Sequence, residues 1–176
     1  MANIGFIGLG IMGTPMARHL QDAGHTVITS KFSAAPRQEL VDNGLKIVDS
    51  PKALAETVDT IILMLPDTPE VEDVLFGESG VSHGLSAGKL VIDMSSISPI
   101  ATKEFAKKIR ATGAEYVDGP VSGGEVGAKN ASLSIMAGGS QESFDRALPL
   151  FQLMGKNITL VGDCGDGQVT KVANQI

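Results

Sequence analysis

The glycine pattern near the N-terminus constrains the fold of this chain more than any other feature. Gly8, Gly10 and Gly13 form G-x-G-x-x-G directly after the apolar run Asn3–Ile7 and at the start of a helical pattern. Between a strand and a helix, this spacing is typical of a turn that binds the pyrophosphate of a dinucleotide. The free N–H groups and the dipole of the following helix add to the attraction for phosphate. We therefore predict cofactor contacts from Gly8, Gly10, Ile11, Met12 and Gly13.

The rest of the chain alternates between short β-branched runs and helical patterns. Further strands are predicted at Thr26–Thr29, Thr60–Leu65, Leu90–Met94, Glu115–Val117, Ser134–Ala137 and Ile158–Val161. Helices are predicted at Met12–Asp22, Ala35–Asn43, Pro51–Glu56, Pro69–Leu75, Pro99–Thr112 and Gln141–Met154. Because parallel strands need crossover connections, this order predicts a Rossmann-type α/β fold with a doubly wound, mostly parallel sheet.

Composition limits the classes of partner. With 176 residues, 43% of them hydrophobic, the chain is long enough to bury the core of one domain. A net charge of -6 argues against a nucleic acid partner, and no membrane span or targeting segment is evident. The single cysteine, Cys164, is compatible with a reducing cytoplasm, where we expect the protein. The histidines lie outside every motif, so we expect no metal.

The segment after the second strand bears on the choice between NAD and NADP. An NAD fingerprint places Asp or Glu about 20 residues after the glycines. The stretch from Ser30 to Arg37 has neither, and it offers Lys31, Arg37 and the hydroxyls of Ser30 and Ser33. These groups suit a 2′-phosphate and favour NADP, with NAD as the alternative. Lys31 and Arg37 are equally explained as solvated surface charges.

Two other strand ends carry candidate cofactor residues. Ligands of open α/β sheets lie beyond the carboxyl ends of the strands, which here precede Leu65-Pro66 and Ser95-Ser96. Ser96 is a candidate contact to the nicotinamide ribose. Alternatively, Ser95 and Ser96 help to cap the helix that starts near Pro99.

Two later segments could bind or transform a substrate. The turn Asp118–Gly124 places the hydroxyl of Ser122 before Gly123 and Gly124, a combination that can form an anion-binding nest or simply a glycine-rich connection. Near the C-terminus, a helical pattern places Lys171 and Asn174 three residues apart on one face. Taken alone, such a lysine is more simply explained as a solvated charge.

Taken together in order, four motifs resemble the β-hydroxyacid dehydrogenase family along the whole chain. They are Gly5–Gly13, Asp93–Ser96, Asp118–Gly124 and Gly167–Gln175. The resemblance is strongest to the branch that reduces tartronate semialdehyde (2-hydroxy-3-oxopropionate) to D-glycerate with NAD(P)H. Imine reductases of the same superfamily are a weaker match because they usually lack the lysine.

The resemblance implies a role for each candidate residue. Lys171 would act as the general acid and Asn174 would orient it, while Ser122, Gly123 and Gly124 would hold the carboxylate of a small-molecule substrate. Gly119 and Ala131 depart from the family pattern at positions without chemistry, and Lys31 stands where NAD-preferring relatives have an acid.

The resemblance also implies a further domain that this sequence does not include. Members of the family continue through the lysine-bearing helix into an all-helical domain that closes the active site and makes the dimer, so the full-length protein is expected to be a homo-oligomer. We predict an NAD(P)-binding domain at residues 1–163 and the start of the interdomain helix at 164–176. A truncated, non-catalytic NADP-binding module is the alternative function.

Overall fold

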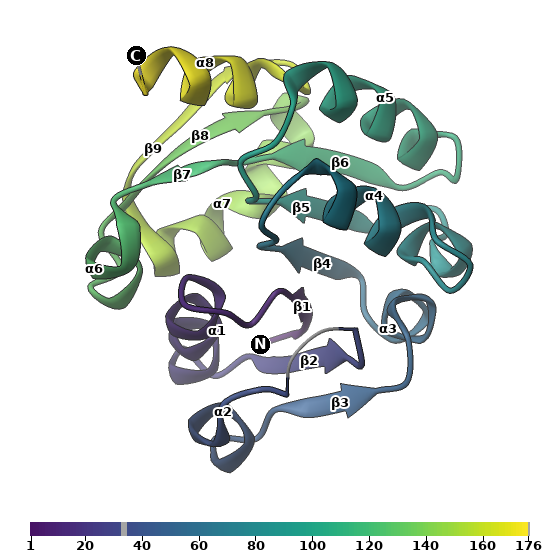
Figure 1. The fold of residues 1–176 in the computed structure, drawn as a ribbon, viewed down its shortest axis with the longest axis vertical. Coiled ribbons are helices and arrows are strands. Elements are labelled where there is room, and N and C mark those ends of the chain that lie inside the picture. The colour runs from purple at the N-terminus through teal and green to yellow at the C-terminus, as the bar shows by residue number, and fades with distance from the viewer. Residues whose placement is uncertain (33–34, 176) are drawn as a thin grey trace.

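The computed structural model describes residues 1–32 and 35–175 and centres on a single mixed sheet (Figure 1). Its parallel part runs in the order β3 (Lys46–Val48), β2 (Thr26–Ser30), β1 (Asn3–Ile7), β4 (Thr60–Leu63), β5 (Leu90–Asp93) and β6 (Glu115–Asp118). Strands β2 and β3 are added on one side of β1, and strands β4 to β6 are added on the other side. The boundary between β1 and β4 is the topological switch point, where ligands of such folds bind. The predicted Rossmann-type fold is confirmed.

The far edge of the sheet departs from purely parallel pairing. Strand β8 (Leu133–Gly138) runs antiparallel to β6 and to the short β7 (Val121–Ser122), whereas β9 (Gly155–Gly162) is parallel to β8. This mixed edge holds the segment that contains Ser122.

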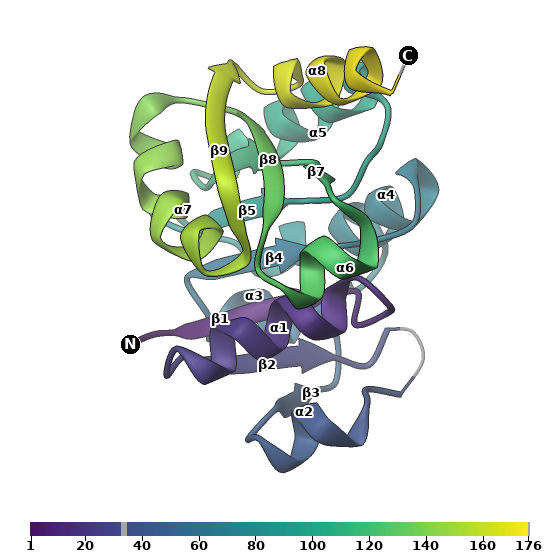
Figure 2. The ribbon, with the colours of Figure 1, turned by 90° about the vertical axis from the view of Figure 1, so that its left-hand side faces the viewer.

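Helices cover both faces of the sheet. Helices α1 (Gly13–Asp22), α6 (Gly124–Lys129) and α7 (Gln141–Met154) lie on one face, and α3 (Pro51–Thr57), α4 (Thr68–Phe76) and α5 (Pro99–Arg110) lie on the other (Figure 2). Side chains alternate accordingly, since Ile4 and Phe6 join the core under α1 and Ile7 joins the core under α3. Remaining helical segments are α2 (Gln38–Asp42), the 3₁₀ turn η1 (Val81–Gly84) and α8 (Asp166–Asn174).

Local sequence signals explain several helix starts. Ser98 caps α5 by accepting a hydrogen bond from the N–H of Ala101 at 3.3 Å, and Pro99 occupies the first turn, as predicted. Ser50 caps α3 and Ser140 caps α7 in the same way.

Some predicted boundaries and elements were wrong. Helix α2 begins at Gln38 and not at Ala35; the predicted contribution of Ser33 lies outside the described residues. Strands β3 and β7 and helix α6 were not predicted, because elements of three, two and six residues are too short to show a periodicity. In the described part of the chain, no helix combines the length and hydrophobicity needed to cross a membrane.

Candidate functional site

The glycine turn after β1 has the geometry that a dinucleotide fingerprint requires. Gly8 has a φ of 108°, and a side chain there would overlap the carbonyl oxygen of Met64. A Cβ at Gly13 would overlap the carbonyl oxygen of Gly8, so this glycine allows α1 to begin against the turn. A Cβ at Gly10 would meet no atom within 4 Å. The fold therefore does not require glycine at position 10, whereas close approach of a ligand to the backbone does.

Two hollows meet over this turn. One, of about 480 Å³, lies at the end of β2 and is lined by Ser30, Lys31 and Phe32 among others. The other, of about 510 Å³, extends toward β4 and β5. Gly8, Leu9 and Phe32 line both, so the hollows form one groove across the switch point. The second hollow is lined by the predicted cofactor residues Gly8, Gly10, Ile11, Met12, Gly13, Leu65, Pro66 and Ser96.

Unpartnered polar atoms indicate what kind of ligand fits the groove. Within the described part of the chain, two buried side-chain oxygens accept no hydrogen bond, Ser30 Oγ and Glu70 Oε2. Ser30 lines the first hollow and Glu70 the second. Since buried polar atoms normally have partners, a ligand with a hydroxyl-bearing group at each end would satisfy both. Two ribosyl groups joined by a pyrophosphate have this arrangement, so the residues fit a nicotinamide dinucleotide.

Lys31 lies at the edge of the first hollow, but its ammonium has a partner there. Lys31 Nζ donates a hydrogen bond to Asp49 Oδ1 at 2.8 Å, and both side chains are exposed. The pair raises the pKa of Lys31 and lowers that of Asp49, so both are charged at neutral pH. Arg37 lines a separate depression with Arg18 and Glu125 and does not line the hollow of Lys31.

The two serines after β5 have different surroundings. Ser95 is fully buried, and its Oγ accepts a hydrogen bond from the N–H of Leu65 at 2.8 Å, which ties the end of β5 to that of β4. Ser96 is exposed and lines the second hollow. The helix cap is Ser98, so the capping alternative for Ser95 and Ser96 was wrong.

The predicted substrate residues lie on the mixed edge of the sheet. Ser122 ends β7 opposite Ser134 of β8 and is half-buried. Gly123 and Gly124 follow with φ values of 132° and 60°, and both are exposed. The loop thus presents its backbone to solvent before α6. These residues do not line either hollow of the groove.

Lys171 and Asn174 lie on α8, which packs against β8, β9 and α5. Lys171 is 9% exposed, whereas Asn174 is exposed. The solvated-charge interpretation of Lys171 was therefore wrong: the helix holds most of this side chain against the protein. Neither residue lines the groove.

A buried network joins the segments that carry the predicted site residues. Asp118 ends β6 and begins the loop to Ser122, and its carboxylate accepts hydrogen bonds from the N–H of Gly165 at 2.8 Å and of Gln168 at 3.0 Å. The Gln168 side chain donates to the carbonyl of Ser95 at 2.7 Å and accepts from the N–H of Ile97 at 3.1 Å. Helix α8 is thereby fixed to the end of β6 and to the loop that follows β5.

The two buried carboxyl groups of this network have raised pKa values. Asp93 and Asp118 are neighbours in the β5–β6 register, and each is fully buried. Burial raises the pKa of both groups to about 6, against the opposing effect of hydrogen bonds from Ser95 and Tyr116 to Asp93 and from Gly165 and Gln168 to Asp118. The phenol of Tyr116 donates to Asp93 Oδ2 at 2.7 Å.

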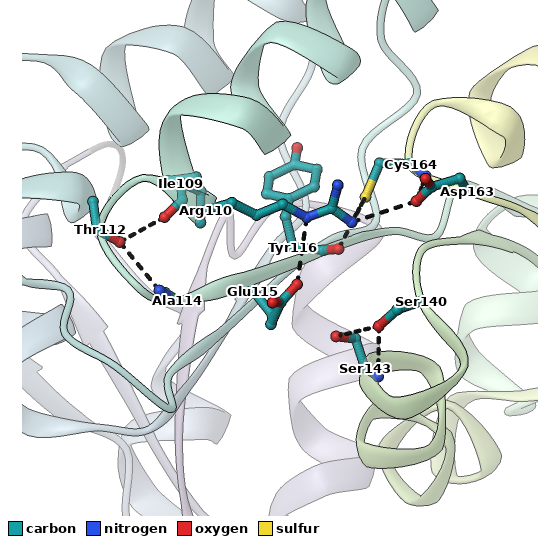
Figure 3. A network of polar contacts seen from close by, with 10 residues as sticks. All are labelled: Ile109, Arg110, Thr112, Ala114, Glu115, Tyr116, Ser140, Ser143, Asp163 and Cys164. Carbon is teal, nitrogen blue, oxygen red and sulfur yellow. Dashed lines mark hydrogen bonds and ion pairs between the residues drawn. The ribbon is translucent and has the colours of Figure 1, made fainter.

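Residues of α5 and β6 hold the segment that leads into α8 (Figure 3). Arg110 of α5 donates to Asp163 at 3.4 Å and to the sulfur of Cys164 at 3.2 Å, and it pairs with Glu115 of β6. The Cys164 thiol in turn donates to the carbonyl of Tyr116 at 3.1 Å. Burial raises the pKa of this thiol to about 12.

Sequence reasoning did not single out several residues that the structure brings to the site. Phe32, Met64 and Glu70 line the groove, and Asp118 and Gln168 connect its neighbouring segments. Asp118 carried a usable signal, an ionisable residue at the end of a buried strand, whereas Glu70 resembles any exposed helix residue in the sequence. Among residues 1–32 and 35–175, no cluster of three or more His, Cys, Asp or Glu side chains could hold a metal ion.

Comparison with known proteins connects this geometry to a group of dehydrogenases. The 2-hydroxy-3-oxopropionate reductase of Escherichia coli is 53% identical over 173 residues, which are 98% of this chain and 59% of the relative. The mitochondrial 3-hydroxyisobutyrate dehydrogenase of Bos taurus is 38% identical over 98% of this chain and 52% of its own length. The chain therefore spans between half and three fifths of these relatives.

A solved structure and a family match agree with them. The Mycobacterium tuberculosis 3-hydroxyisobutyrate dehydrogenase superposes with a TM-score of 0.91 at 33% identity, over 99% of this chain and 59% of that one. The predicted resemblance to the β-hydroxyacid dehydrogenases is confirmed. Because the family model for the NAD binding domain of 6-phosphogluconate dehydrogenase matches residues 3–162, the chain belongs to that family of NAD-binding domains.

Proposed function

We propose that this chain binds NADPH in the groove over the glycine turn and serves the reduction of tartronate semialdehyde to D-glycerate, or of a closely related small hydroxy-acid aldehyde. The observation that carries the proposal is the groove itself, because two hollows meet at Gly8 and Leu9 and each is lined by a residue with a buried oxygen that has no partner in the described chain. The 53% identity to 2-hydroxy-3-oxopropionate reductase supports the choice of substrate.

In this proposal each residue has a defined task. The glycine turn and the start of α1 would bind the pyrophosphate, Leu65, Pro66 and Ser96 would contact the nicotinamide half, and Lys31 would bind the 2′-phosphate. When bound, the reduced nicotinamide supplies a hydride to the carbonyl carbon of the aldehyde.

The proton and the substrate carboxylate need partners from this chain. Lys171 would donate a proton to the carbonyl oxygen, so that hydride and proton together convert the aldehyde to an alcohol. Asn174, three residues along α8, would orient the ammonium, and Ser122, Gly123 and Gly124 would hold the carboxylate. Positioned proton transfer of this kind typically contributes roughly 10²–10⁴-fold to a rate.

A non-catalytic nucleotide-binding module is the second candidate. One observation favours it: neither Lys171 nor Ser122 lines the groove. In both functions, residues 1–163 would form the nucleotide-binding domain.

The test has two stages. Titration with NADPH, followed by nucleotide fluorescence, should show saturable binding that Gly10→Ala weakens at least tenfold. Turnover with tartronate semialdehyde is then compared for the chain alone and for a chimera that adds the part of the E. coli reductase that the chain does not match. Turnover by the chimera that Lys171→Met abolishes would support the reductase. Binding without turnover in either protein would select the binding module, and no binding would refute both.

A further inference from the structure

We infer that Asp49 sets how strongly this chain discriminates between NADPH and NADH. The inference rests on the proposed function, since it concerns the same groove. It assigns a specificity role to a residue that follows β3 and lies outside every sequence motif.

The sheet brings Asp49 against Lys31, and Lys31 lines the first hollow, where the adenosine ribose would lie; Asp49 itself does not line this hollow. Strands β2 and β3 are parallel, with Ser30 opposite Val48, and the N–H of Lys31 donates to the carbonyl of Val48 at 3.0 Å. The next residue on each strand therefore lies beyond the same carboxyl end, where Lys31 Nζ meets Asp49 Oδ1 at 2.8 Å. Ile47 of β3 also lines the first hollow beside Lys31.

The acid that β2 lacks is thus supplied by β3. NAD-binding sites of this fold use a carboxylate near the end of β2 to accept a hydrogen bond from the ribose 2′-hydroxyl. Asp49 is 88% exposed in its side chain and has oxygens free of steric cover, so it can accept such a bond while still paired with Lys31. Ser30, whose Oγ is buried and has no partner in the described chain, lines the hollow next to Lys31.

The same carboxylate disfavours a phosphate. A 2′-phosphate carries close to two negative charges and would have to compete with Asp49 for the ammonium of Lys31. The pair as a whole is neutral, so the net positive charge expected from Lys31 alone is absent. Because exposed ion pairs are weak, Lys31 can still exchange partners, and the chain accepts both nucleotides with a reduced preference for NADPH.

The experiment measures dissociation constants for NADPH and NADH with the whole chain, by nucleotide fluorescence at low salt. Asp49→Asn should tighten NADPH about three- to tenfold and leave NADH unchanged or weaker. Asp59→Asn is the matched control, since it removes the same charge from an exposed position at the opposite end of the parallel strands. It should leave the ratio of the two constants unchanged.

A second pair of variants tests whether Asp49 acts through Lys31. In a Lys31→Met background, Asp49→Asn should improve NADPH binding by a smaller factor than in the wild-type background. An NADPH/NADH ratio that Asp49→Asn does not move, although both nucleotides bind, would overturn the inference and leave the proposed function intact. If the wild-type chain bound neither nucleotide, both would be refuted.

Discussion

The carboxylate of Asp118 accepts a hydrogen bond from the backbone N–H of Gln168, at 3.0 Å, across 50 residues of sequence. The same carboxylate accepts one from Gly165, so it satisfies two N–H groups at the start of α8 that have no partner within the helix. Lys171 lies one turn further along this helix. The end of β6 therefore fixes the position of the proposed proton donor, although Asp118 does not line the groove.

Replacement of Asp118 by Ala should loosen this end of α8. Two buried N–H groups would lose their acceptor, and we expect the free energy of unfolding to fall by about 2 kcal/mol. Hydrogen exchange at the amides of Gly165 and Gln168 should accelerate more than exchange in α1. Asp145→Ala, on the exposed surface of α7, is the control and should change neither quantity. Uniform acceleration across the whole chain would argue against a specific role in α8.

The three glycines of the fingerprint should separate into two classes when each is changed to Ala. Gly8→Ala and Gly13→Ala force a side chain onto backbone atoms and should lower the free energy of unfolding by about 1–3 kcal/mol. Gly10→Ala meets no protein atom and should unfold like the wild type, yet it should lose NADPH affinity. Urea denaturation and nucleotide titration measure the two effects. A Gly10→Ala chain that bound normally would place the pyrophosphate elsewhere.

Local rules made the glycine turn and the main elements predictable from the sequence. Gly13 is required by the carbonyl oxygen of Gly8, within the same turn. Gly8 is required by the carbonyl oxygen of Met64, at the end of the neighbouring strand β4 that the Rossmann topology places beside β1. The strand Asn3–Ile7 and the helix Gln141–Met154 were predicted with their observed bounds. The strand is a continuous apolar run that ends at the glycine turn, and the helix is long enough to show a hydrophobic period.

Contacts between distant segments were not predictable in the same way. The Lys31–Asp49 pair depends on the register of β3, an edge strand of three residues without a sequence signal. The role of Gln168 depends on how α8 packs beside β6 and the loop that follows β5. The residue type of Lys171 alone indicated an exposed charge. Its burial follows from the packing of α8 and could not be read from its neighbours in the sequence.

Acidification from pH 8 to pH 5 should stabilise the fold through its buried carboxylates. The pKa of Asp93 is about 6 in the folded chain and about 3.9 when unfolded, so between these values the folded state holds the extra proton. Its favourable contribution is complete below about pH 4 and is lost as the pH rises through 6. Asp118 acts in the same direction.

Asp93→Asn isolates this effect. The difference in free energy of unfolding between the variant and the wild type, measured in urea at several pH values, should grow in favour of the variant as the pH rises from 5 to 8. The slope should not exceed about 1.4 kcal/mol per pH unit for one carboxyl group. A difference that stays constant with pH would mean that Asp93 is charged in the fold throughout this range.

The thiol of Cys164 should be unreactive in the folded chain. It is 6% exposed, and burial raises its pKa to about 12, so almost none of it is the nucleophilic thiolate at pH 8. Ellman's reagent should therefore modify one thiol per chain quickly in denaturant. In buffer, the reaction should be limited by the rate at which the fold opens locally around Cys164. Arg110 lies across the sulfur at 3.2 Å, and its charge opposes the rise in pKa while its side chain shields the thiol.

Arg110→Ala distinguishes these two effects of the arginine. Loss of the charge raises the thiol pKa further and slows the reaction, whereas loss of cover and of the contacts to Asp163 and Glu115 allows the start of α8 to open more often. Because the reaction needs opening before ionisation, we expect the variant to react faster than the wild type. A slower reaction would show that Arg110 acts on Cys164 chiefly through charge, and that other contacts hold the start of α8 closed.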